Sequence, residues 1–98
     1  MENLAANNKL IRSFLGSKFC IKDSLEKSRP LFSYFDNQLL FHKDWNWIMK
    51  LVHEITTEDD FQTDYPKNFL FWEAFNQIDI EETYNACIDF INWKNEQK

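Results

Sequence analysis

The sequence has few of the residues that tight turns and disulfide frameworks require. Its 98 residues include one glycine, two prolines and two cysteines. A turn-rich β sandwich uses many glycines and prolines, so their scarcity favours helices with short connections. No apolar run approaches the length of a transmembrane helix, and the first residues, MENLAANNKL, do not read as a signal peptide.

The chain also lacks the motifs of metal sites and active sites. Cys20 and Cys87 have no metal-type spacing, and neither His42 nor His53 has a histidine or cysteine companion one helical turn away. There is no glycine-rich phosphate loop and no nucleophile elbow. We therefore expect a cytoplasmic protein with reduced thiols that is not an enzyme and uses no metal or cofactor.

Basic residues are outnumbered. Sixteen acidic residues against eleven basic ones make the net charge -5. General affinity for nucleic acids depends on lysine and arginine contacts with phosphates, so this balance argues against it. An acidic surface either serves solubility or suits a basic protein partner.

Aromatic residues are abundant, with ten phenylalanines and four tryptophans. A chain of this length buries roughly two thirds of its unfolded surface, which is enough for one modest core. We expect a single domain over residues 1–98, mainly α, with three principal helices near residues 4–15, 45–56 and 79–95. Short β pairings in the middle are compatible with this class, and an α+β fold is the alternative.

The first helix has an apolar stripe and a clear stop. Leu4, Ile11, Phe14 and Leu15 recur at helical spacing. Gly16 follows them, where a left-handed residue commonly ends a helix.

The central helix is predicted to start after Asp44, whose carboxylate can cap the first turn. Its expected buried face comprises Trp45, Ile48, Met49, Val52, Ile55 and Thr56. In this phase Trp45 anchors the core, Trp47 lies at the boundary and His53 faces solvent.

The last helix has the clearest pattern. Asp79 and Glu82 have the spacing of a capping box. The predicted inner face, flanked by Phe90, comprises Ile80, Tyr84, Cys87, Ile88 and Ile91. The predicted outer face comprises Glu81, Glu82, Asn85, Asp89 and Asn92. Trp93 falls near the outer face, where it either contacts a partner or folds back onto a neighbouring helix.

Two middle segments are harder to assign. After a short strand at residues 19–21 and a polar connection, residues 31–35 and a turn at Asp36-Asn37 form either a small hairpin or an ordered aromatic loop. TTEDDFQTD is predicted to be a solvated acidic connection. NFLFWEAF, residues 68–75, is a buried helix, a buried strand or an exposed binding segment, and we favour burial.

Three stretches carry a resemblance to a known group. NNKLIRSFLG (7–16) is similar to NNKLIAEFMG, FHKDWNWIMKLVHEI (41–55) to YHxSWDWLMPVVEKI, and TYNACIDFINWKNE (83–96) to TYNAVVEFIKWYNE. These segments belong to small proteins of Bacteroidetes phages and prophages, especially flavobacterial ones. Lys50 replaces the usual proline and Lys94 the usual tyrosine. Members usually have β structure before the last helix, where this chain is short and acidic.

The resemblance implies no catalytic residue but changes the expected function. Small acidic phage proteins often inhibit a host defence protein, as anti-CRISPR proteins do. The expected target is an RNA-guided effector of type VI-B (Cas13b), ahead of type II-C (Cas9), and its basic channel for guide and target RNA would receive an acidic surface. The predicted contact residues are Glu81, Glu82, Asp89 and Trp93, with Trp47, Glu58, Asp59 and Asp60.

Two other functions are kept as alternatives. One is a phage accessory or assembly protein that self-associates through aromatic side chains. The other is an RNA-binding module in which aromatic residues stack on bases, although the net charge opposes it. No membrane partner is expected, and the protein is a monomer or a homodimer.

Overall fold

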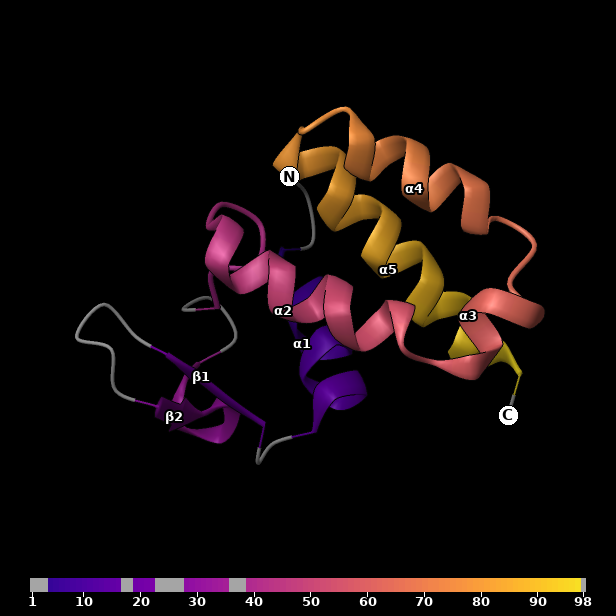
Figure 1. The fold of residues 1–98 in the computed structure, drawn as a ribbon. Helices are drawn as coiled ribbons and strands as arrows, with labels where there is room; N and C mark the ends of the chain where they lie inside the picture. Colours follow the sequence, from indigo (N-terminus) through magenta and orange to yellow (C-terminus); the bar gives the residue numbers. More distant parts are fainter. Residues whose placement is uncertain (1–3, 17–18, 23–27, 36–38, 98) are drawn as a thin grey trace. The chain divides into compact units, whose positions relative to one another are not determined.

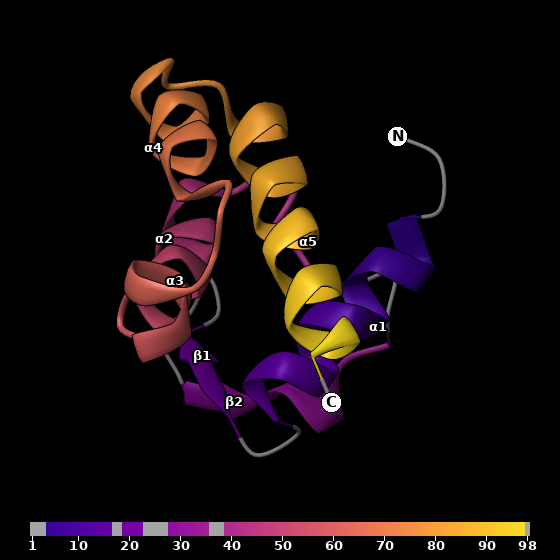
Figure 2. The same cartoon turned by 90° about the vertical axis from the view of Figure 1, so that its right-hand side faces the viewer.

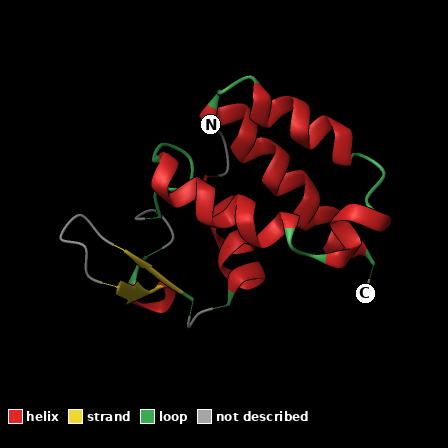
Figure 3. Ribbon diagram, in the orientation of Figure 1, coloured by secondary structure: helices red, strands yellow, loops and turns green. Residues whose placement is uncertain are grey.

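The computed structural model describes residues 4–16, 19–22, 28–35 and 39–97. These residues are mainly helical, with one small antiparallel sheet of two strands (Figures 1 and 3). The predicted mainly α class is therefore confirmed. The chain divides into two compact units, residues 1–39 and 40–98. The expectation of one domain stays a prediction.

In the first unit, helix α1 (Leu4–Leu15) ends where the sequence predicts. Gly16 has φ +93°, a left-handed conformation that glycine adopts without a side-chain clash. Its N–H donates to the carbonyl of Arg12 at 2.8 Å, which closes the last turn. The only glycine of the chain thus acts as a helix stop.

Strand β1 (Cys20–Lys22) pairs with β2 (Ser28–Pro30), with Ile21 opposite Arg29. β1 overlaps the predicted strand, but β2 lies in the segment predicted as a polar connection. Residues Leu31–Ser33 form a 3-10 turn, η1. Pro30 lies opposite Cys20, and the N–H of the next residue, Leu31, donates to the carbonyl of Phe19 at 2.9 Å, so the missing N–H of Pro30 does not interrupt the pairing. The predicted Asp36-Asn37 turn lies outside the described residues.

Side chains of the first unit support the segment after β2. The guanidinium of Arg29 lies 4.3 Å from the centre of the Tyr34 ring and donates to the carbonyl of Ser33 at 3.2 Å. Arg12 donates from α1 to the carbonyl of Tyr34. These contacts connect the helix to an aromatic segment that has no sheet of its own.

The second unit contains four helices: α2 (Trp45–Thr56), α3 (Asp59–Thr63), α4 (Asn68–Asn76) and α5 (Ile80–Glu96). α5 packs against both α2 and α4, and α3 packs against α2 (Figures 1 and 2). α5 is therefore the shared partner of the two other long helices in this unit.

Helix α2 starts as predicted but buries a different face. The carboxylate of Asp44 accepts from the N–H of Asn46 at 2.9 Å. Trp45 is 37% exposed and Met49 is 43% exposed, whereas Trp47 is 4% exposed and packs edge-on against Phe41. The buried set is Trp47, Ile48, Leu51, Val52 and Ile55.

The placement of Trp45 in the core and of Trp47 at the boundary is therefore wrong. Apolar residues cover more than half of the circumference of α2, so the pattern permits more than one phase. The packing of neighbouring elements decides between them. The prediction that His53 is exposed is confirmed.

The acidic connection contains a short helix that the sequence analysis did not predict. Phe61 of α3 is buried in an aromatic cluster, with ring centroids 5.0 Å from Phe71, 5.8 Å from Trp72 and 5.7 Å from Phe90. Edge-to-face contacts at such distances are favourable. A purely solvated connection is therefore wrong, because one phenylalanine anchors the segment.

Helix α4 is the NFLFWEAF segment. Phe71 is 2% exposed, but Phe69 is 62% exposed, and Leu70 and Trp72 are also exposed. The favoured expectation of burial is thus wrong for most of these side chains. A short helix that packs through one side leaves the other side open, whatever residues it carries.

Helix α5 follows the prediction most closely. The Asp79 side chain accepts from the N–H groups of Glu81 and Glu82, at 3.0 and 3.2 Å. The predicted inner face of α5 is buried apart from the half-buried Ile80, and the five predicted outer residues are exposed.

Candidate protein-binding groove

A groove runs between α4 and α5. It consists of two adjoining hollows with volumes of about 300 Å³ and about 230 Å³. The hollows share Tyr65, Lys67 and Asp89 in their linings, so they lie side by side along α5. The groove follows the outward face of α5 over most of its length.

Each wall of the groove has its own chemistry. The α5 wall is mainly polar, and its residues are Glu82, Asn85, Ala86, Asp89, Asn92, Trp93 and Glu96. The α4 wall mixes apolar and polar residues, which are Leu70, Phe71, Glu73, Ala74 and Gln77. Tyr65, Pro66 and Lys67 complete the lining from the turn before α4.

The lining is acidic. Its carboxylates are Glu73, Glu82, Asp89 and Glu96, and its one cation is Lys67. Four negative charges and one positive charge give a net charge of -3. Low-dielectric walls on both sides strengthen the attraction of such a groove for a cation.

Tyr65 joins the groove to the aromatic core. Its ring centroid lies 5.1 Å from that of Phe90 and 5.2 Å from that of Trp93. Burial, followed by the charges of Asp89 and Cys87, raises the pKa of Tyr65 to about 12. The phenol therefore stays neutral at physiological pH and adds no charge to the groove.

Three of the sequence-predicted contact residues come together here. Glu82, Asp89 and Trp93 all line the groove. Trp93 is half-buried and packs against Tyr65 and Phe90, so it folds back and borders the groove at the same time. Glu81 is exposed on the first turn of α5 but does not line the groove.

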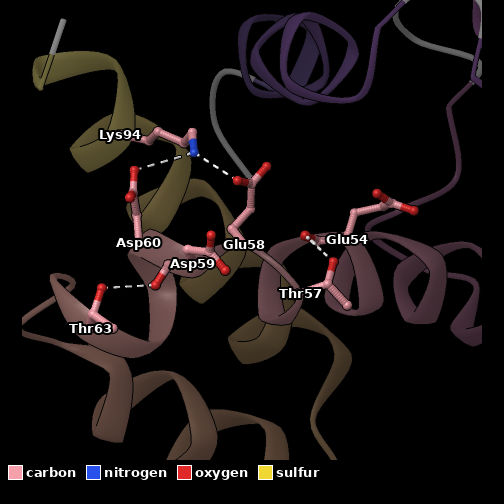
Figure 4. A network of polar contacts seen from close by, with 7 residues as sticks. All are labelled: Glu54, Thr57, Glu58, Asp59, Asp60, Thr63 and Lys94. Carbon is pink, nitrogen blue, oxygen red and sulfur yellow. Dashed lines mark hydrogen bonds and ion pairs between the residues drawn. The ribbon is translucent and has the colours of Figure 1, made fainter.

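The other predicted residues lie elsewhere. Trp47 is buried in the core and offers no contact surface. Glu58 and Asp60 hold the ammonium of Lys94, at 2.9 and 3.5 Å, whereas Asp59 is exposed and does not join them (Figure 4). None of these four residues lines the groove, so they are not among its candidate partner contacts.

Lys94 is a structural residue that the sequence analysis missed. Its hydrogen bond to Glu58 is the main cause that raises its pKa, and partial burial opposes this. The ion pairs link α5 to the start of α3, more than thirty residues away in sequence. The signal available beforehand was Lys94 itself, where the resemblance leads one to expect a tyrosine, together with the acidic residues 58–60, which had no assigned partner.

The other candidate chemistry is weak. The described residues contain no group of three His, Cys, Asp or Glu side chains placed to hold a metal ion. Cys87 is fully buried, and burial raises the pKa of its thiol, which disfavours the nucleophilic thiolate. Within the described ranges, no helix is both long and apolar enough to span a membrane.

Comparisons with protein-family models, curated proteins and solved structures found no match for this chain.

Proposed function

We propose that this protein is a non-enzymatic inhibitor that binds a basic host protein of nucleic-acid defence through the groove between α4 and α5. The observation that carries the proposal is the lining of four carboxylates and one lysine beside a half-buried tryptophan. Charge complementarity of this kind steers association and selects partners. Tryptophan is a frequent anchor in protein interfaces.

An RNA-guided effector fits this description as a partner. Such enzymes hold the guide and target strands in a positively charged channel. A protein with carboxylates in a shaped groove can engage cations that otherwise contact phosphates. The resemblance to flavobacterial phage proteins points to a type VI-B effector in the cytoplasm of the bacterial host.

The direct test is co-purification of the tagged protein with effectors from a flavobacterial lysate, followed by target-RNA cleavage assays. We expect a complex that weakens as salt increases, because salt screens the attraction between exposed charges. At 0.15 M salt this attraction is largely lost beyond about 8 Å. We also expect cleavage to decrease as inhibitor is added. Failure to retain any nucleic-acid enzyme at low salt would refute the proposal.

A matched pair of substitutions separates the groove from general acidity. Glu82→Lys should reduce effector binding at least about tenfold, which corresponds to about 1.4 kcal/mol, and adding Asp89→Lys should reduce it further. Glu81→Lys adds the same charge to the same helix end as Glu82→Lys but lies outside the groove lining. It should change binding by less than about twofold.

Self-association is the second candidate, and the exposed side of α4 favours it. Phe69, Leu70 and Trp72 place three large apolar side chains at the surface of one short helix. Exposed apolar patches often mark interfaces. Sedimentation equilibrium would show a dimer that Phe69→Ser with Trp72→Ser converts to a monomer. A monomer at high concentration would exclude this function.

The RNA-binding alternative is least favoured, because the carboxylates of the groove repel phosphates. A gel shift with single-stranded RNA at moderate salt tests it. Tight binding by the isolated protein would reverse this ranking.

A further inference from the structure

The groove-facing residues of α5 repeat every seven positions. Glu82, Asp89 and Glu96 carry the carboxylates, and Asn85 and Asn92 repeat with the same interval. Ala86 and Trp93 do so as well, and they supply the apolar positions of this wall. The polar face of α5 is therefore ordered rather than merely acidic.

Seven residues correspond to about two helical turns and to a rise of about 10.5 Å along the axis. Residues with this interval stay on one side of a helix and drift by only about 20° per repeat. The three carboxylates thus form a row along the groove, with an apolar position between each pair.

We propose that the groove binds an α-helix of the partner that carries lysine or arginine at seven-residue intervals. This inference rests on the proposed function and specifies the partner segment. A partner helix has the same rise as α5, so its cations stay in register with Glu82, Asp89 and Glu96. Binding of an amphipathic helix in a groove is a common mode of recognition.

Other backbone conformations fit the row less well. On a β-strand, side chains of one face recur at about 6.6 Å and 13 Å, and neither spacing matches about 10.5 Å. A polyproline helix repeats at about 9.3 Å, so the mismatch grows with each repeat. The helix is the only one of the three that keeps all three cations aligned.

The apolar residues of the groove also constrain the sequence of the partner helix. Ala74 on α4 and Ala86 on α5 are small apolar residues that line the first hollow. Leu70 and Trp93 extend the apolar lining beyond them. The partner helix should therefore carry apolar residues three or four positions after each cation, as in other helix–groove complexes.

Lys67 makes the site selective. Like Asp89, it belongs to the linings of both hollows. A cation placed opposite Lys67 is repelled, so a helix that is basic on every side binds less well than one with a single basic row.

Two synthetic peptides of identical composition, each about 21 residues long for adequate helicity, test the inference. One carries lysines at seven-residue intervals with leucines four positions later, and the other distributes the same residues around the helix. Calorimetry with the full chain should show that the first peptide binds at least about tenfold more tightly. Equal affinity would overturn the inference, because it would indicate attraction by net charge alone.

Three variants sharpen the test. Asp89→Lys should weaken binding of the first peptide at least about tenfold, whereas Glu81→Lys should leave it within about twofold. Lys67→Glu should strengthen it, which no general loss of structure can produce. Thermal unfolding of each variant checks that the fold is retained. Weakening by Lys67→Glu would contradict the assigned position of the partner.

The two proposals fail in different ways. If the peptide binds as expected but no effector is retained or inhibited, the proposed function is wrong and the helix-binding groove stands. If an effector is inhibited and Glu82→Lys with Asp89→Lys weakens its binding, but the two peptides bind equally, the function stands and this inference is wrong.

Discussion

Helices α4 and α5 border the same groove but use their residues differently. α5 separates its chemistry, with apolar side chains buried on one face and carboxylates and amides exposed on the other. α4 is apolar at six of its nine positions yet leaves Phe69, Leu70 and Trp72 exposed. One wall therefore supplies a pattern of charge and the other supplies apolar area.

The difference shows that apolar composition does not by itself predict burial. α5 packs against two helices, so its inner face is covered along its length. α4 packs mainly against α5, and Phe69, Leu70 and Trp72 stay exposed on its other sides. An apolar residue is buried only where a neighbouring element covers it.

The strongest test of this contrast uses the same substitution on each helix. Phe90→Ala removes a ring that contacts Phe61, Tyr65 and Trp93, and it should lower the free energy of unfolding by about 3–5 kcal/mol. Phe69→Ala should lower it by less than about 1 kcal/mol, because most of that ring is exposed. Urea unfolding of both variants measures the difference. Equal losses would show that α4 is covered in solution.

Helix α2 allows the same comparison between two tryptophans. Trp47→Ala should lower the free energy of unfolding by about 3–5 kcal/mol, and Trp45→Ala by about 1 kcal/mol. Thermal unfolding followed by circular dichroism gives both values. A larger loss for Trp45→Ala than for Trp47→Ala would show that Trp45 lies in the core and that the buried face of α2 is the one predicted from the sequence.

The pH dependence of stability probes Tyr65, a buried residue of the groove lining. The pKa of Tyr65 is raised from 10.0 to about 12, so the folded state holds a proton that the unfolded state releases above pH 10. Stability should therefore be complete below pH 10 and fall by about 1–3 kcal/mol as pH rises to 12.

Tyr65→Phe should reduce that fall, and Asp89→Asn should lower the pKa of Tyr65 by removing one cause of its increase. Absorbance of tyrosinate as a function of pH reports the titration directly. An ordinary pKa for Tyr65 would mean that water reaches its phenol group.

The smallest expected effect is at the turn that joins the two walls. Ile78 has φ +54°, which is unfavourable for a β-branched residue, and its side chain is 80% exposed. Ile78→Gly should raise the free energy of unfolding by about 1 kcal/mol, because glycine adopts this conformation without strain. Ile78→Val retains the strain and serves as the control. A loss of stability in the glycine variant would show that the isoleucine side chain makes favourable contacts.

Much of the site on α5 was predictable from the sequence. Its polar and apolar residues separate cleanly at helical spacing, so Glu82, Asp89 and Trp93 could be selected before the groove was known. The α4 wall could not, because NFLFWEAF has no polar face that would define its orientation. Lys67, Leu70 and Glu73 join the site only through the way α4 packs on α5.

The sequence by itself determined where α2 and α5 begin and where α1 ends. The caps at Asp44 and Asp79 and the stop at Gly16 depend on contacts within a few residues, so local chemistry is sufficient. The tertiary structure decided the buried face of α2, the anchoring of Phe61, the pairing of Lys94 with Glu58 and Asp60, and the groove. Each of these depends on residues far apart in sequence, whose proximity follows from packing rather than from local pattern.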